Sequence, residues 1–258
     1  MVEARQNKQR RIKMKHPNDT SLEFLHVCPN DELATLVEIV ASPSSQRITS
    51  ELSSTQNYKN FYPDHSKYVD ELIEDYQKFG GNTMANMVRG YGVSYAEILR
   101  DVAERLKVNF NPQQSSVQIE DALLSKVLKD YWQNLTPEAR KATLDDLKVD
   151  AHSFGGASAD VLLAVFKAGG FKSYQVLLML ANWLAKVFVG RGLSIAANAG
   201  LTKIASVVFG PVGWIVGGVW TAFDIASPAY RVTVPATVYI AILRRIHEKP
   251  LAMSVEAA

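Results

Sequence analysis

The spacing of apolar residues along this chain predicts an all-helical protein. Apolar positions recur every three or four residues through the first 150 residues, and no stretch alternates between apolar and polar residues as a strand would. The helices expected from this spacing cover residues 22–40 (as one or two short helices), 67–79, 82–90, 95–107, 117–135 and the segment from 137 onward. Residues 42–57 are rich in Ser, Thr and Gln and are expected to be a linker.

Local signals sharpen three of these helix boundaries. Ser94 and Glu97 have the spacing of a capping box, in which each side chain accepts a hydrogen bond from a free amide of the first turn. Thr136 followed by Pro137 predicts an N-cap and an N1 proline. The Gly80-Gly81 pair predicts a C-cap in which glycine takes a positive φ.

The last hundred residues contain two long apolar runs that predict a helical hairpin at about 173–223. Ile204–Phe223 is a run of twenty residues without charge, enough to cross about 30 Å of hydrocarbon as a helix. Ser173–Val189 is interrupted only by Lys186, whose long side chain could reach the interface. The same runs would also suit the core of a large soluble helical protein. A third run, Val232–Leu243, contains Pro235 and is too short to cross.

Small and amphipathic residues within this region are candidates for helix packing or membrane contact. Gly213 and Gly217 have GxxxG spacing, which lets two helices approach closely in lipid. The rings of Trp214 and Trp220 are of the kind enriched at membrane interfaces, although both residues lie inside the Ile204–Phe223 run and not at its ends. The candidates are Gly192, Ala196, Gly200, Gly210, Gly213, Trp214, Gly217, Gly218 and Trp220.

Charge divides the chain into zones that suggest its domain organisation. The chain has 258 residues, of which 47% are hydrophobic and 21% charged, which excludes a wholly disordered protein. Residues 1–16 form a basic leader, expected to be disordered, and residues 17–57 a small helical module with its linker. Residues 58–150 are an acidic helical domain, and 151–258 an apolar region with a net charge of +5. The expected fold class is all-α, an acidic multi-helix domain followed by a hydrophobic, glycine-rich helical hairpin.

This distribution favours membrane or protein partners over nucleic acid. The overall net charge is +2, and outside the leader the excess of basic over acidic residues lies in the apolar region 151–258, which is not the pattern of a basic groove. The single cysteine, Cys28, cannot form an internal disulfide and fits a reducing compartment. We therefore expect a cytoplasmic protein with association at the inner face of the cell membrane.

The sequence offers little sign of catalysis, and we expect no metal and no cofactor. The five histidines are scattered without the spacing of a metal site, and His26 and Cys28 would point apart on a helix. Asp64-His65-Ser66 is expected to be a loop. The glycines around Arg89 lack the Gly-Lys-Ser/Thr of a nucleotide loop. An enzyme with an anion site at Arg89 and Tyr230-Arg231 remains a lesser alternative.

Three segments together resemble the bacterial YaaW-like family. They are Leu22-Glu23-Phe24-Leu25-His26-Val27-Cys28, the glycine-rich stretch from Phe79 to Val102, and Ala229-Tyr230-Arg231-Val232-Thr233-Val234-Pro235-Ala236 with Leu243-Arg244-Arg245. The motif residues, which have no assigned role, are Phe79, Gly80, Gly81, Asn86, Arg89, Gly90, Gly92, Tyr230, Arg231 and Pro235. The resemblance implies a small amino-terminal module followed by a region, roughly residues 67–135, similar to ubiquinol–cytochrome c chaperones, which are helical, non-catalytic assembly factors for a membrane complex.

The functional expectation is a non-enzymatic binding protein. Its acidic helical domain would bind a protein partner, and its C-terminal half would contact membrane lipid or a membrane protein. It would act either as a chaperone-like assembly factor or as a membrane-active effector whose hairpin inserts on a trigger. The alternative is a soluble helical adaptor or scaffold in which the apolar C-terminal half is the core.

Overall fold

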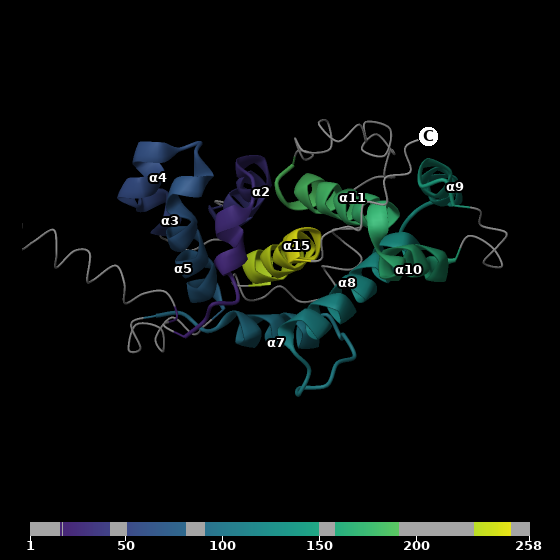
Figure 1. The fold of residues 1–258 in the computed structure, drawn as a ribbon, viewed down its shortest axis with the longest axis horizontal. Helices are drawn as coiled ribbons and strands as arrows, with labels where there is room; N and C mark the ends of the chain where they lie inside the picture. Colours follow the sequence, from purple (N-terminus) through teal and green to yellow (C-terminus); the bar gives the residue numbers. More distant parts are fainter. Residues whose placement is uncertain are drawn as a thin grey trace, which may run out of the picture.

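The computed structural model describes residue 16 and residues 18–41, 51–80, 91–149, 158–190 and 230–248, and every regular element among them is helical. The expected all-α fold class is therefore confirmed. The elements, drawn in Figure 1, are η1 (Glu23–Val27), α2 (Asn30–Ala41), α3 (Glu51–Ser54), α4 (Gln56–Phe61), η3 (His65–Tyr68), α5 (Val69–Phe79), α7 (Tyr95–Arg105), α8 (Ser116–Gln133), α9 (Pro137–Asp146), α10 (Ala159–Ala168), α11 (Gly170–Phe188) and α15 (Tyr230–Glu248).

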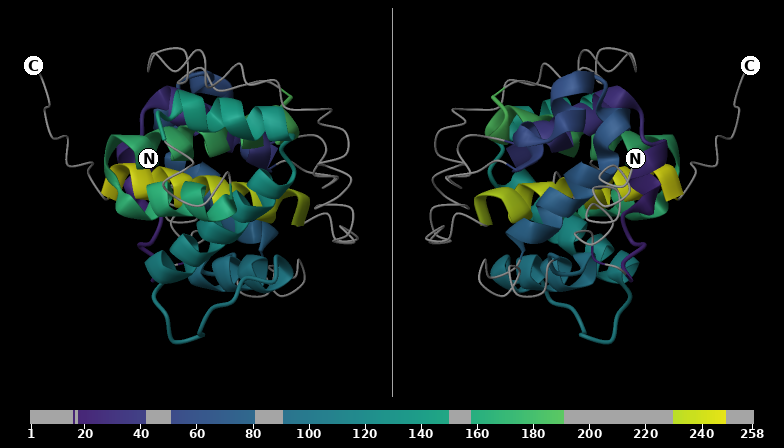
Figure 2. Two further views of the ribbon diagram at one scale, coloured as in Figure 1. Left: turned by 90° about the vertical axis from the view of Figure 1, so that its right-hand side faces the viewer. Right: turned by 90° about the vertical axis from the view of Figure 1, so that its left-hand side faces the viewer.

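The last helix, α15, lies in the middle of the fold. It contacts η1, α2, α5, α7 and α8 from the first part of the chain and α11 from the second. In both side views α15 runs between helices from the two parts (Figure 2). Its side chains from Val232 to Leu243 are all buried, including those of Pro235 and the two threonines. The shortest of the three apolar runs is thus the centre of the core.

Two buried hydroxyl contacts fix α15 against its neighbours. The Tyr76 hydroxyl on α5 lies 2.7 Å from Thr237 Oγ1. The Tyr239 hydroxyl donates to the main-chain oxygen of Glu32 on α2 at 3.0 Å. Because a buried polar group needs a partner, these contacts favour one register of α15 over its rotated alternatives.

The helix-start signals in the sequence are confirmed. Ser94 and Glu97 form the predicted capping box at the start of α7. Thr136 accepts from the amide of Ala139, and Pro137 begins α9. A second capping box, from Ser115 and Gln118, begins α8. These caps satisfy amides that the first turn of a helix otherwise leaves without partners.

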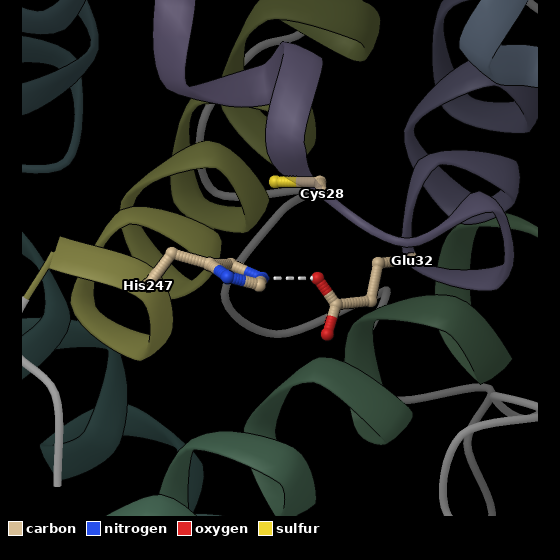
Figure 3. Close-up of side chains that lie close together, drawn as sticks. All are labelled: Cys28, Glu32 and His247. Carbon is tan, nitrogen blue, oxygen red and sulfur yellow. Dashed lines mark hydrogen bonds and ion pairs between the residues drawn. The ribbon is translucent and has the colours of Figure 1, made fainter.

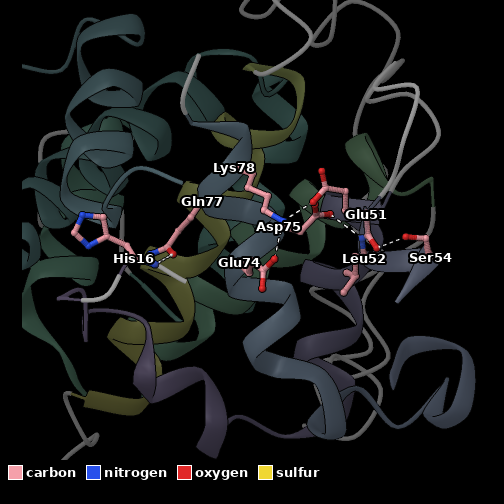
Figure 4. Close-up of polar contacts among 8 residues, drawn as sticks. All are labelled: His16, Glu51, Leu52, Ser54, Glu74, Asp75, Gln77 and Lys78. Atoms are coloured by element: carbon pink, nitrogen blue, oxygen red, sulfur yellow. Dashed lines mark hydrogen bonds and ion pairs between the residues drawn. The ribbon is translucent and has the colours of Figure 1, made fainter. Parts of the chain in front are cut away.

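The expected linker at 42–57 is wrong for its second half, which forms α3 and the start of α4. Leu52 of α3 is buried, and its amide donates to the buried carboxylate of Asp75 on α5 at 3.3 Å. Lys78 of α5 bridges the carboxylates of Glu51 and Glu74, the latter at 2.6 Å (Figure 4). These short polar helices are stabilised by their contacts with α5. A helix of so few residues shows no apolar periodicity in the sequence, so it could not be predicted from the pattern.

The expected loop at Asp64-His65-Ser66 is also wrong, because His65–Tyr68 form the helix η3, which Asp64 precedes. His65 is buried, its amide donates to the side-chain oxygen of Asn30 at 2.6 Å, and its Nδ1 lies 2.5 Å from the Tyr68 hydroxyl. These adjacent polar residues therefore belong to a folded turn, which the hydrogen bond from His65 to Asn30 holds against α2.

Two motif glycines permit close approach between backbone segments. Gly80 has a φ of −71°, so the expected positive φ is wrong at this glycine, and Gly81 lies outside the described residues. A Cβ at Gly80 would instead overlap the side chain of Ile98 on α7. A Cβ at Gly92 would overlap the main chain of Gln77 on α5, whose carbonyl accepts from the Val93 amide at 3.2 Å. Both glycines bring the segment before α7 against α5.

The first apolar run of the expected hairpin is a core helix. Ser173–Val189 falls within α11 and its C-cap, and α11 contacts α10 and α15. The side chains from Val176 to Ala185 are all buried. Among the described helices, none combines the length and the apolarity that crossing a bilayer requires.

Candidate functional site

The C-terminal end of α15 carries a concentration of charged groups inside the fold. The Arg244 guanidinium lies 3.0 Å from Glu120 Oε1 of α8, and the two side chains are 8% and 3% exposed. The Tyr95 hydroxyl of α7 donates to the same oxygen. Arg244 also stacks over the Phe24 ring at 4.4 Å and donates to the main-chain oxygen of Ser21. Four segments thus meet at one guanidinium.

This arrangement uses the fixed geometry of arginine. The planar fork of guanidinium donors serves a carboxylate and a carbonyl together while its face lies on an aromatic ring. Burial, and then the charge of Glu120, raise the pKa of the Tyr95 hydroxyl well above its usual value, so Tyr95 stays a donor to the carboxylate. The Arg244–Glu120 pair thus joins α15 to α8 inside the core.

A second cluster lies one turn further along α15. His247 Nε2 lies 2.5 Å from Glu32 Oε2, and Cys28 completes a group whose potential ligand atoms are all within 4.8 Å of one another (Figure 3). Cys28 and Glu32 are buried and His247 is partly exposed. Burial, with a smaller contribution from the Glu32 charge, raises the pKa of the Cys28 thiol to about 12. Thiol, carboxylate and imidazole are the side chains that could hold a metal here.

Sequence reasoning did not find this Cys28–Glu32–His247 cluster. His247 is 215 positions from Glu32 along the chain. Cys28 follows the last residue of η1, and Glu32 lies in the first turn of α2. The two residues do not share a helix, so helical spacing does not predict that their side chains are close. The spacing rules that led us to expect no metal apply to ligands on one element, whereas here the fold joins the two ends of the chain.

The motif residues at the start of α15 take part in surface contacts. The Tyr230 hydroxyl donates to Asp101 Oδ1 of α7 at 2.9 Å, and the Arg105 guanidinium lies 4.9 Å from the Tyr230 ring centroid. Arg231 is exposed, and Phe79 is buried beside Gly80. Tyr230 therefore joins α15 to α7. The other half of the considered anion site, Arg89, lies outside the described residues, as do Gly81, Asn86 and Gly90.

The residues considered for helix packing or membrane contact all lie outside the described part of the chain. These are Gly192, Ala196, Gly200, Gly210, Gly213, Trp214, Gly217, Gly218 and Trp220, together with the Ile204–Phe223 run. Their roles remain predictions from the sequence.

Comparison with known proteins places the chain in a family. A UPF0174 protein of Helicobacter pylori strain J99 is 42% identical over 236 residues, covering 90% of this chain and 93% of the relative. The chain belongs to the UPF0174 family. The UPF0174 protein YaaW of Escherichia coli strain K12 is 30% identical over 237 residues, covering 89% of this chain and 95% of that protein. The predicted YaaW-like resemblance is thus confirmed.

A family model extends the comparison toward function. The model described as ubiquinol-cytochrome C chaperone matches residues 64–238. This span runs from just before η3 into α15, so it includes α5, α7–α11 and the motif residues of unknown role, and it extends well beyond the expected 67–135. No solved structure matches the chain.

Proposed function

We propose that this protein is a non-enzymatic, chaperone-like helical protein that binds a protein partner through its acidic helical region. The observation that carries the proposal is the match of residues 64–238 to the ubiquinol-cytochrome C chaperone model. The charged groups around α15 agree with it, because Arg244, Glu120 and Tyr95 are engaged with one another inside the core. By analogy with that description, the proposed partner is a membrane protein before its assembly.

The end of α4 is the proposed contact surface for the partner. Phe61 and Tyr62 are 43% and 57% exposed, and together they form what we call the aromatic tip. The Tyr58 ring lies 5.3 Å from both the Tyr62 and Tyr68 rings, so the tip rests on a layer of other aromatic side chains. Figure 1 places α4 at the outer end of the described helices, away from α9 and α10. Exposed aromatic side chains on a fixed base are typical anchors of protein interfaces.

A client-binding assay tests this proposal. A helical membrane protein is diluted out of detergent, and its aggregation is followed by light scattering with increasing amounts of the full chain. We expect suppression that saturates near equal amounts of the two proteins. The F61S/Y62S variant should lose most of the effect, whereas K59S, a change at an exposed residue of the same helix, should keep it. No suppression by the wild type, or equal suppression by F61S/Y62S, would contradict the proposal.

The C-terminal region supplies a proposed contact with the membrane. Ile204–Phe223 is uncharged over twenty residues, and residues 151–258 carry a net charge of +5. An apolar run beside basic residues suits a membrane whose inner surface is anionic. In this proposal the helical body binds the partner while the uncharged run holds the protein at the bilayer, on the cytoplasmic side.

A second candidate function is an adaptor whose apolar C-terminal half is its own core. The burial of Val176–Ala185 in α11 favours it, because one of the two runs of the expected hairpin is covered by protein. The adaptor needs no lipid. Behaviour at a membrane therefore separates the two candidates.

A further inference from the structure

The Cys28–Glu32–His247 cluster has a ligand set that suits a particular kind of metal ion. Thiolate sulfur, imidazole nitrogen and carboxylate oxygen are the three ligand types found in zinc sites. Their mixture favours zinc and neighbouring first-row ions over magnesium or calcium, which take oxygen ligands alone.

The backbone around the cluster is held in place by local hydrogen bonds. The Cys28 amide donates to the Leu25 carbonyl at 3.2 Å, which closes η1. The Glu32 amide donates to the Pro29 carbonyl at 3.1 Å and to Asp31 Oδ1 at 3.2 Å, which fixes the first turn of α2. The Glu32 carbonyl accepts from Tyr239 in the middle of α15, the helix that carries His247 near its end. Two ligands and the helix of the third are thus positioned before any ion binds.

The distances are within reach of a tetrahedral centre. Zinc bonds of about 2.0–2.3 Å place neighbouring ligand atoms about 3.5 Å apart. The Cys28, Glu32 and His247 atoms already lie within 4.8 Å of one another, and the imidazole and carboxylate are 2.5 Å apart. Moving them by about 1 Å, which side-chain rotation supplies, would give the required spacing. Figure 3 shows the three side chains converging from η1, α2 and α15.

Each of the three side chains takes part in a hydrogen bond that a bound ion would replace. The Cys28 thiol donates weakly to the Phe24 carbonyl at 3.6 Å, and a proton lies between His247 and Glu32. A divalent cation would release these protons to the solvent and bind the Cys28 thiolate, the His247 imidazole and the Glu32 carboxylate at once. The partial exposure of His247, whose side chain is 23% accessible, leaves a way in for the ion.

We propose that Cys28, Glu32 and His247 bind one Zn²⁺ ion, with a fourth position left for water or an exchangeable donor. The ion would join the amino-terminal η1–α2 segment to the end of α15 and stabilise the native state by mass action. This inference is independent of the chaperone-like function, since it depends on the contacts of these three side chains.

Cobalt substitution gives a direct test, because Co²⁺ occupies zinc sites and reports its ligands by absorption. Cys28 is the chain's single cysteine, so a thiolate-to-cobalt charge-transfer band can arise from no other residue. The metal-free full chain is titrated with Co²⁺ and then with Zn²⁺. We expect one Co²⁺ per chain with this band, and loss of the band as Zn²⁺ displaces the cobalt. Absence of the band at saturating Co²⁺ would overturn the proposal, whatever the behaviour of variants.

Variants then assign the other ligands. C28S should abolish the band, and E32Q and H247Q should weaken Zn²⁺ binding by at least ~10-fold, since even losing a supporting partner costs about 10–100-fold. The matched control is H26Q, because His26 lies 3.3 Å from Asp70 Oδ1 and 3.6 Å from Glu23 Oε2 at the surface, where adventitious binding could occur. Circular dichroism confirms that each variant folds. Binding that is lost in H26Q and kept in H247Q would overturn the assignment.

Discussion

Replacing Arg244 with methionine tests the central buried contact of the fold. The R244M change keeps most of the side-chain volume but removes the cation that lies 3.0 Å from Glu120 Oε1. The Glu120 side chain is 3% exposed, so its carboxylate would stay in the core without this cation. Removing one partner of a buried pair costs about 3–5 kcal/mol, a large part of the roughly 5–15 kcal/mol that stabilises a typical domain.

The neighbouring arginine provides a matched control. Arg245 Nη1 lies 2.9 Å from Asp121 Oδ1, but the Asp121 side chain is 38% exposed. Water can therefore solvate that carboxylate after the change, and R245M should cost only about 1 kcal/mol, including the loss of its contact with the Phe166 ring. Urea unfolding followed by far-ultraviolet circular dichroism measures both free energies.

A double variant separates the buried charge from the lost packing. In R244M/E120L the carboxylate is gone, and replacing a buried ion pair by apolar groups is often close to neutral. The Tyr95 hydroxyl then loses its acceptor, which costs about 1–3 kcal/mol. We expect the double variant to be more stable than R244M alone. Equal losses for R244M and R245M, or a double variant less stable than R244M, would refute the reasoning.

Three further predictions follow from the structure and the proposed function. G92A should lower the free energy of unfolding by about 1–3 kcal/mol and by more than G80A, because its new methyl group meets the main chain of Gln77 instead of a side chain that can rotate; urea unfolding of both variants decides this. Burial lowers the pKa of His65 below the ordinary histidine value of about 6.5, so the contribution of His65 to the free energy of unfolding should be complete above that pH and be lost as the pH falls through the folded-state pKa. H65Q should remove this part of the pH dependence of the free energy of unfolding, and an unchanged dependence would contradict the prediction. The protein should bind vesicles without releasing a trapped dye, and leakage would favour a membrane-active effector over an assembly factor.

Helix caps and the longer helices could be predicted from the sequence, because the interactions that form them lie within one short segment of the chain. The cap at Ser94 and the Thr136-Pro137 start depend on atoms within one helical turn, so four letters suffice to define them. The long helices α7 and α8 follow from apolar periodicity over several turns. The short helix α3 escaped prediction because its stability comes from Asp75 and Lys78 on another helix.

The candidate sites depended on contacts between distant positions and could not be predicted. Arg244 and Glu120 are 124 residues apart, and no pattern in the sequence around either residue indicates that the two are in contact. Cys28 and His247 were each visible as reactive residue types, yet only the docking of α15 brings them together. Gly80 was expected to take a positive φ at a C-cap and Gly92 had no assigned role, whereas both glycines permit close approach to neighbouring elements, which is a tertiary property.

The proposal that this protein works at a membrane is tested most directly by washing membranes from cells that express the full chain with alkaline carbonate. This treatment strips peripheral proteins but leaves segments held in hydrocarbon. We expect the wild type and I215L in the pellet and I215D in the supernatant, because a carboxylate near the middle of Ile204–Phe223 opposes burial in lipid. Full release of the unaggregated wild type would contradict membrane insertion and favour the adaptor, with the uncharged run as part of its core.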